Sequence, residues 1–130
     1  MRSFQTQTSA MIWLSRLAGI TGVSLIIVLS LVPGSYRPHT GAPSGFEHFF
    51  AYGLTAVALV LGWWSLTQSV LIIVGLFVLA CGLELAQLIV PGRSSDLGTA
   101  IVSGLAGVCG VLLATGLWRY LPSSKCGELR

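Results

Sequence analysis

Four long apolar runs, separated by short segments rich in polar residues, proline or glycine, follow one another along the chain. They cover residues 11–32, 46–65, 69–90 and 97–118, and a helix needs about 20 mostly apolar residues to cross a bilayer. Pro33-Gly34 ends the first run and Pro91-Gly92 ends the third, and such pairs are typical of turns. The pattern predicts four transmembrane helices in a single domain over residues 1–130.

The composition excludes several other classes of protein. Of the 130 residues, 54% are hydrophobic and 8% are charged, and the mean hydropathy is +0.85. Soluble domains carry about 25% charged residues, so this chain has too few to cover a water-facing surface. Three cysteines are too few for a disulfide scaffold. We therefore expect an all-α membrane protein, a four-helix transmembrane bundle in contact with the lipid bilayer.

Positive charges are divided unevenly between the two ends of the predicted helices. If both termini are cytoplasmic, that side carries Arg2, Arg16, Arg119, Lys125 and Arg130, and the other side carries only Arg37 and Arg93. Lys and Arg are enriched in cytoplasmic loops, so the count predicts that both termini are cytoplasmic. The net charge of +3 then reflects topology, and no nucleic-acid partner is expected.

The first apolar run has an alternative interpretation as a secretory signal peptide. Signal peptides end in a cleavage site with small residues, whereas this run ends in Leu31-Val32-Pro33-Gly34. An uncleaved first helix is the preferred interpretation.

Glu84 is the most unusual residue in the apolar runs. A carboxylate at the bilayer centre costs about 2.5–3.5 kcal/mol, so it normally faces the bundle interior and has a partner. Gln87 follows one helical turn later, close to the same face. We interpret Glu84 as a functional residue, with a polar pair that holds helices together as the alternative. For Gln87 the two interpretations stay open.

His48 begins a polar stripe on the second predicted helix. His48, Tyr52 and Thr55 recur at helical spacing in an otherwise apolar segment, and the stripe is expected to face Glu84. A histidine near a carboxylate is a candidate pair for proton transfer. The alternative, an interfacial histidine in contact with headgroups or water, stays open.

Three other charged residues lie near the predicted helix ends. Ser44-Gly45-Phe46-Glu47 has the form of a capping box, so Glu47 is assigned to capping. Asp96 directly precedes the fourth run and is assigned to the helix cap. Arg93 is assigned a functional role, because a guanidinium there can pair with a carboxylate or bind a lipid phosphate.

The fourth run carries small residues at intervals of three and four positions: Ala100, Ser103, Gly104, Gly107 and Gly110. Small faces of this kind let helices approach closely in lipid. They predict a tight bundle and a homodimer interface. The sequence has no Cys/His metal cluster, no phosphate-binding glycine loop and no nucleophile elbow, so neither a metal nor a cofactor is expected.

The residues from Phe46 to Ala114 resemble the VanZ-like family of small bacterial membrane proteins, named after a protein linked to resistance to the glycopeptide teicoplanin. The resemblance rests on His48 followed by Tyr52, then on a Glu-x-x-Gln helix that leads into Pro-Gly-Arg, and on a glycine-rich last helix. The family usually has Asp-Lys where this chain has Ser44-Gly45, and Asp then Asn where it has Thr99 and Ser103. The resemblance implies a multi-pass protein of the bacterial inner membrane with a role in the cell envelope.

Two functions from different classes follow from these observations. The preferred one is a binding protein whose polar cluster, Glu84, Gln87, His48, Tyr52 and Arg93, recognises a lipid-linked or anionic headgroup or a membrane partner on the outer side. The alternative is a small intramembrane enzyme or proton-coupled device, with Glu84 and His48 as the candidate catalytic residues. We predict that Glu84, Gln87, His48 and Arg93 converge on one cavity that opens on the non-cytoplasmic side.

The charge count predicts that reporters fused to the two termini both locate to the cytoplasm. The measurement is a fluorescent or enzymatic topology reporter at each end of the full chain. Reporters on opposite sides of the membrane contradict the predicted topology.

Overall fold

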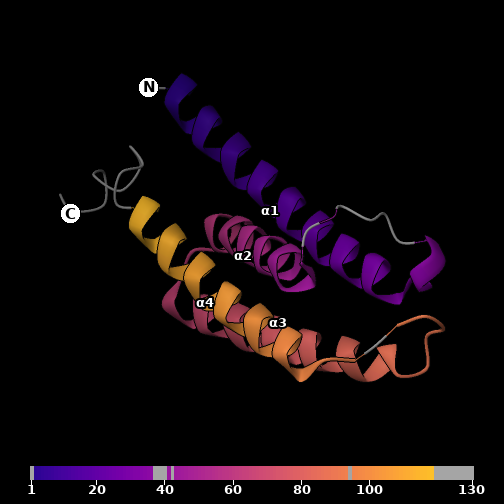
Figure 1. Ribbon diagram of the computed structural model, residues 1–130. Helices are drawn as coiled ribbons and strands as arrows, with labels where there is room; N and C mark the ends of the chain where they lie inside the picture. Colours follow the sequence, from indigo (N-terminus) through magenta and orange to yellow (C-terminus); the bar gives the residue numbers. More distant parts are fainter. Residues whose placement is uncertain (1, 37–40, 42, 94, 119–130) are drawn as a thin grey trace.

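The computed structural model describes residues 2–36, 41, 43–93 and 95–118, without the side chains of residues 2–8 and 118. The described chain is all-helical, so the predicted all-α class is confirmed (Figure 1). It contains four long helices and one short 3-10 helix: α1 (Arg2–Leu31), η1 (Gly34–Tyr36), α2 (Ser44–Gly62), α3 (Leu66–Gln87) and α4 (Leu97–Trp118).

Each long helix contains a segment long and apolar enough to cross a membrane: Ser9–Leu31, Ser44–Gly62, Leu66–Gln87 and Leu97–Leu117. The fold therefore defines a multi-pass membrane protein, and the predicted four-helix bundle is confirmed. The side that faces the cytoplasm stays a prediction. Arg37, Arg119, Lys125 and Arg130, which carry much of that prediction, lie outside the described residues, as does the side chain of Arg2.

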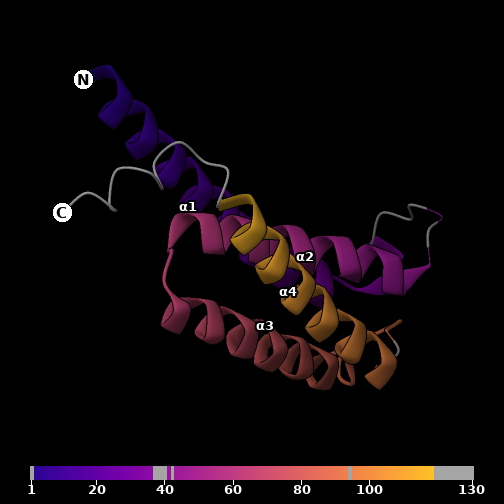
Figure 2. The same cartoon turned by 90° about the vertical axis from the view of Figure 1, so that its left-hand side faces the viewer.

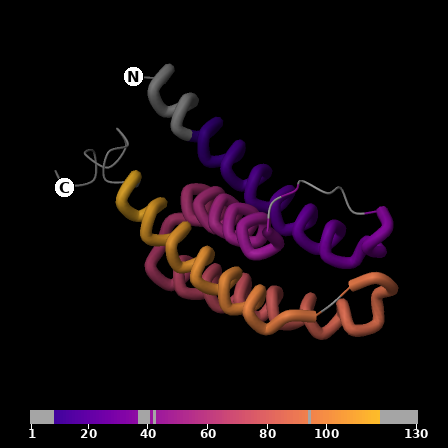
Figure 3. The backbone as a smooth tube through the Cα atoms, viewed as in Figure 1, coloured from indigo at the N-terminus to yellow at the C-terminus, as the bar shows by residue number. Residues whose placement is uncertain are grey.

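The helices alternate in direction, so the start of one helix lies at the same end of the bundle as the end of the helix before it. The N-terminal part of α1, from residue 9 onward, and the end of α4 lie at one end of the bundle (Figure 3). The opposite end gathers the end of α1, the start of α2, the end of α3 and the start of α4. We call this second end the site end. Every predicted site residue except Tyr52 lies within a few residues of a helix terminus at this end.

Several predicted helix boundaries differ from the structure. The helices α1, α2 and α3 begin at Arg2, Ser44 and Leu66 instead of residues 11, 46 and 69, and two helices end three residues early. The second helix ends at Gly62 instead of residue 65, because Ser65 is the N-cap of α3 and its hydroxyl accepts a hydrogen bond from the backbone N–H of Gln68 at 3.1 Å. A serine is a favoured N-cap residue, so it favours the start of α3 at Leu66. The third helix ends at Gln87 instead of residue 90, and residues 88–90 form turns.

Helix α2 is the centre of the bundle. It packs most extensively on α4 and next on α1, whereas α3 packs mainly on α4. Figure 2 shows α1 alongside α2, with α4 crossing α2 obliquely and approaching α3 at the site end. The core between them consists of small and medium side chains such as Ala56, Val60, Leu76 and Ala106.

The small-residue face of α4 is used within the bundle. A Cβ atom added to Gly110 would collide with the carbonyl oxygen of Gly53 on α2 and would lie 2.8 Å from the Cβ of Ala56. Ser103 and Ala106, on the same face, are fully buried. Small residues here let α2 and α4 approach closely, as expected for helices in lipid. The homodimer through this face stays a prediction without support, because α2 and α3 cover much of the face within one chain.

An arginine closes the end of the bundle opposite the site end. Arg16 of α1 donates a hydrogen bond from Nε to the carbonyl oxygen of Gly62, the last residue of α2, at 2.9 Å. Its guanidinium lies over the rings of Trp13 and Trp63, at 5.3 and 5.2 Å from their centroids. A cation at a helix C-terminus interacts favourably with the helix dipole. This contact ties α1 to α2 far from the site end.

The α2–α4 contact predicts opposite effects for two glycine substitutions on the same helix. Gly110→Ala should lower the free energy of unfolding by about 1–3 kcal/mol, because its Cβ overpacks the contact with Gly53. The control is Gly116→Ala, whose Cβ meets nothing within 4 Å, and alanine there should stabilise the helix by up to about 1 kcal/mol. Thermal unfolding in detergent, followed by tryptophan fluorescence, measures both. Equal melting temperatures for the two variants contradict the described packing.

Candidate functional site

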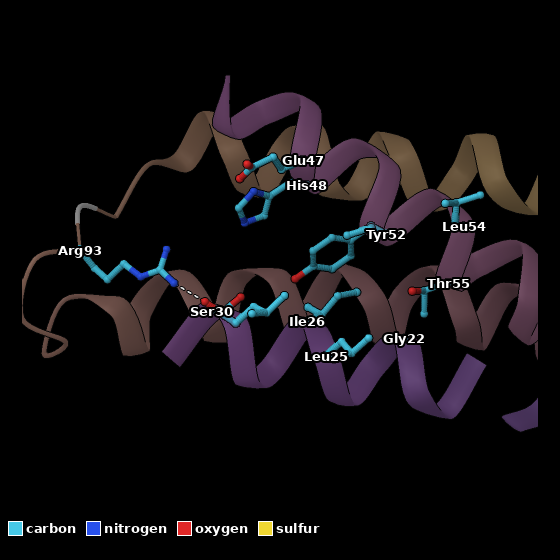
Figure 4. A pocket seen from close by; sticks show the side chains of 12 residues that line it. Gly22, Leu25, Ile26, Ser30, Glu47, His48, Tyr52, Leu54, Thr55 and Arg93 are labelled. Atoms are coloured by element: carbon cyan, nitrogen blue, oxygen red, sulfur yellow. Dashed lines mark hydrogen bonds between the residues drawn. The ribbon is translucent and has the colours of Figure 1, made fainter. Parts of the chain in front are cut away.

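A pocket of about 410 Å³ lies between α1 and α2 and reaches the site end of the bundle (Figure 4). Its wall combines apolar and polar side chains from the two helices and one arginine from the α3–α4 connection. The larger apolar residues are Leu25, Ile26, Leu29 and Leu54, and the polar ones are Ser30, Glu47, His48, Tyr52, Thr55 and Arg93. The volume falls within the range of about 300–1,000 Å³ typical of ligand pockets.

The charged groups are concentrated at one end of this pocket. In Figure 4, Arg93, Glu47 and His48 lie at the end nearest the helix termini, whereas Leu54 and Gly22 lie at the other end. The pocket is therefore amphipathic, with a charged end at the site end and an apolar part that continues between the two helices. Leu25, Leu29 and Leu54 are 53%, 45% and 66% exposed, so the apolar part borders the outer surface of the bundle.

His48 is held in a defined orientation. Its Nδ1 lies 2.9 Å from the carbonyl oxygen of Ser44, one turn earlier in α2. A carbonyl oxygen only accepts, so Nδ1 carries the proton and Nε2 is the second nitrogen available to a ligand. The imidazole also stacks on the ring of Tyr52, with centroids 6.2 Å apart and planes at 16°. His48 thus presents an acceptor when neutral and a donor when protonated.

Glu47 lines the pocket, and the predicted capping box is wrong. Helix α2 has Pro43 as its N-cap, with no side-chain cap hydrogen bond, and Ser44 is already helical. The backbone N–H of Glu47 donates to the carbonyl oxygen of Pro43 at 3.4 Å. A capping serine must lie before the first helical residue. Because the helix starts one residue earlier than the motif implies, the Glu47 carboxylate lies at the pocket instead.

Gln87 and Arg93 bind the C-terminal carbonyl groups of α1, and we call this arrangement the α1 clasp. Gln87 donates from Nε2 to the carbonyl oxygen of Ser30 at 3.2 Å. Arg93 donates from Nε to the carbonyl oxygen of Val32 at 3.1 Å and from Nη2 to that of Leu29. The last carbonyl groups of a helix have no partner within it. The clasp supplies these partners and fixes α1 at the edge of the pocket.

The α1 clasp is supported by the connection that carries Arg93. Gly92 adopts a positive φ of 74°, a conformation that glycine adopts without strain. The backbone N–H of Gly34, just after α1, donates to the carbonyl oxygen of Pro91 at 3.3 Å. The segment Pro91-Gly92-Arg93 therefore lies against the backbone just after α1. This contact brings Arg93 to the α1 carbonyl groups.

Glu84 faces the bundle interior, as predicted, and it holds the start of α4. It is 6% exposed, and its Oε2 accepts a hydrogen bond from the backbone N–H of Asp96 at 2.8 Å. Asp96 in turn caps α4, as predicted, because its Oδ1 accepts from the backbone N–H of Gly98 at 2.9 Å. Both carboxylates therefore support the α3–α4 connection.

The predicted convergence on one cavity holds for part of the cluster. His48, Tyr52 and Arg93 line the pocket, whereas Glu84 and Gln87 are not among the described lining residues. Tyr52 of α2 is one of the buried residues that line the pocket. The sequence missed the contribution of α1. Ser30 was detectable as a polar residue in an apolar run, whereas Leu25 carries no such signal.

No group of three or more His, Cys, Asp or Glu side chains that could hold a metal ion occurs within the described ranges. Among the described residues that line the pocket, the polar groups are one guanidinium, one carboxylate, one imidazole and several hydroxyl groups. These groups can form hydrogen bonds and ion pairs with a polar headgroup.

Comparisons with protein-family models, with curated proteins and with solved structures found no match to this chain. The resemblance to the VanZ-like family stays a prediction that rests on the sequence motifs.

The contact between Glu84 and Asp96 predicts that two substitutions of Glu84 differ. Glu84→Leu should lower the free energy of unfolding by about 1–3 kcal/mol, because the backbone N–H of Asp96 loses its acceptor. Glu84→Gln should retain most of the stability, because its amide oxygen can accept the same hydrogen bond. Thermal unfolding in detergent measures both variants. A melting temperature for Glu84→Leu equal to that of the wild type contradicts this role.

Proposed function

We propose that this chain is a VanZ-like protein of the bacterial inner membrane that binds a membrane amphiphile, a lipid or a lipid-linked precursor of the cell envelope. The observation that supports this function best is the amphipathic pocket between α1 and α2. The hydrocarbon chain would lie along the apolar wall, and the headgroup would lie at the charged end.

The position of the pocket suits a ligand that arrives from the bilayer. Leu25, Leu29 and Leu54 border both the pocket and the exposed surface of the helices. A hydrocarbon chain can therefore pass between lipid and pocket without crossing water. Burial of apolar surface that lipid already covers contributes little free energy, so selectivity must come from the headgroup.

The charged end of the pocket offers this selectivity. Arg93 supplies a permanent positive charge and planar N–H donors of the kind that bind phosphate. His48 adds a ring nitrogen held in place by Ser44. At the ends of transmembrane helices these groups are at the depth of lipid headgroups. With cytoplasmic termini, as the charge count predicts, this depth is in the outer half of the membrane.

The alternative function, an intramembrane acid/base enzyme, depended on Glu84 and His48 acting on one substrate. The carboxylate of Glu84 instead accepts the backbone N–H of Asp96, and His48 lines the pocket without it. Binding is therefore the function that the geometry favours.

Ala51→Trp tests the proposed function by filling the pocket. Ala51 lines the pocket, and an indole at this position would occupy the space of the hydrocarbon chain. We expect the affinity for lipid to fall at least about tenfold, which corresponds to about 1.4 kcal/mol of binding free energy. The measurement is native mass spectrometry of the detergent-purified full chain titrated with phospholipid.

Ala18→Trp is the matched control, because Ala18 is exposed on α1 and is not one of the lining residues. It should bind phospholipid as the wild type does. Circular dichroism and size-exclusion chromatography check that both variants remain folded. Equal lipid binding by Ala51→Trp and Ala18→Trp contradicts the proposed function.

A further inference from the structure

The side chain of Tyr52 brings a hydroxyl group into the pocket between α1 and α2. The residue is 2% exposed, and it nevertheless lines the pocket. Figure 4 shows its ring on α2, with the hydroxyl oxygen directed towards the α1 side of the pocket. A ligand that enters the pocket therefore meets this hydroxyl.

The Tyr52 hydroxyl has no hydrogen-bond partner among the described residues, although its ring stacks on that of His48. All fully enclosed polar side-chain atoms of the described residues do have such a partner. The hydroxyl is therefore not fully enclosed, and it borders the space of the pocket. Buried polar groups without a partner are rare and costly in proteins. The site thus favours a ligand that supplies a hydrogen-bond acceptor.

The position of Tyr52 along α2 fixes the depth of this hydrogen bond in the pocket. Tyr52 follows His48 by one helical turn, which is about 6 Å along the helix axis. In Figure 4, His48 lies on the side of the charged end, and Leu54 lies on the opposite side of Tyr52. The hydroxyl therefore lies where the polar part of the pocket passes into the apolar part.

Thr55 carries the other α2 hydroxyl that lines the pocket, and it is less accessible to a ligand. A Cβ atom added to Gly22 of α1 would collide with the Thr55 hydroxyl oxygen, so this oxygen lies directly against α1. Tyr52 is therefore the residue of α2 that offers a ligand a hydrogen-bond donor at this depth.

The chemistry of membrane lipids at this depth decides which ligand fits. In an ester-linked glycerophospholipid, the ester carbonyl groups follow the phosphate within a few bonds, where the acyl chains begin. A carbonyl oxygen accepts hydrogen bonds, and a hydroxyl group donates them. A polyprenyl phosphate carries oxygen only in its phosphate, so its hydrocarbon would face the hydroxyl without offering an acceptor. Sites built around a hydrogen bond discriminate against ligands that lack the partner group.

We propose that the Tyr52 hydroxyl donates a hydrogen bond to an ester carbonyl of the bound lipid, and that the ligand is an ester-linked glycerophospholipid. This inference rests on the proposed function, and it selects the lipid over the lipid-linked precursor. It places no demand on the charge of the headgroup. Tyr52 is the residue that determines this specificity.

The test compares a diacyl and a dialkyl phosphatidylglycerol of equal chain length, titrated onto the full chain in detergent and measured by native mass spectrometry. The wild type should bind the diacyl lipid about fivefold more tightly, because an ether oxygen is a much weaker acceptor than an ester carbonyl. Tyr52→Phe should remove this preference by weakening the binding of the diacyl lipid, with the binding of the dialkyl lipid unchanged. A preference retained in Tyr52→Phe overturns the inference.

Tyr36→Phe is the matched control for the loss of a hydroxyl group. Tyr36 is 79% exposed and is not among the described lining residues. The preference for the diacyl lipid should therefore be unchanged in this variant. A preference lost equally in Tyr36→Phe and Tyr52→Phe overturns the assignment of specificity to Tyr52.

A second comparison pairs phosphatidic acid with a long-chain polyprenyl phosphate, because both carry a phosphate monoester as the headgroup. The wild type should bind phosphatidic acid about fivefold more tightly, for the same reason. Equal or tighter binding of the polyprenyl phosphate overturns the assigned class of ligand.

The remaining outcomes separate this inference from the proposed function. Equal binding of the diacyl and dialkyl lipids by the wild type overturns the hydrogen bond to an ester carbonyl. If Ala51→Trp still reduces the binding of both lipids in that case, the pocket remains a lipid site and only the ligand class is wrong. If Ala51→Trp reduces neither, the proposed function fails together with the inference.

Discussion

The need of the last α1 carbonyl groups for hydrogen-bond donors shapes the site end of this protein. These carbonyl groups have no partner within the helix, and a buried one left without a donor costs free energy. Gln87 and Arg93 reach these carbonyl groups from α3 and from the connection behind it. The α1 clasp thereby holds the end of α1 in place while the rest of the helix packs on α2. The pocket lies beside the clasp, because Arg93 and Ser30 belong to both.

The polar residues that stand out in the apolar runs have two different tasks. Glu84, Gln87 and Asp96 bind backbone groups of other segments and keep the helix ends together. His48 and Glu47 lie at the pocket, and Arg93 does both, because it binds α1 carbonyl groups and lines the pocket. An intramembrane carboxylate is therefore no direct pointer to the ligand site here, since satisfying a backbone N–H is a sufficient reason for its burial.

At each end of the bundle, an arginine side chain donates hydrogen bonds to the last carbonyl groups of a helix. At one end Arg16 donates to the last carbonyl group of α2, and at the other Arg93 donates to the last carbonyl groups of α1. The surroundings differ, because Arg16 is enclosed by two tryptophan rings whereas Arg93 lies at a pocket with a carboxylate. This difference is why a ligand is proposed at one end only.

The sequence by itself determined the four helices, the Asp96 cap and the inward direction of Glu84, because these depend on run length, on local capping chemistry and on the cost of charge in lipid. Tertiary structure decided the partners of Glu84 and Gln87, the place of Glu47 and the use of the small-residue face of α4. Helices in lipid are apolar on every side, so periodicity does not tell which face meets which neighbour. The clasp joins residues 57 to 64 positions apart, and such contacts exist only once the helices have packed.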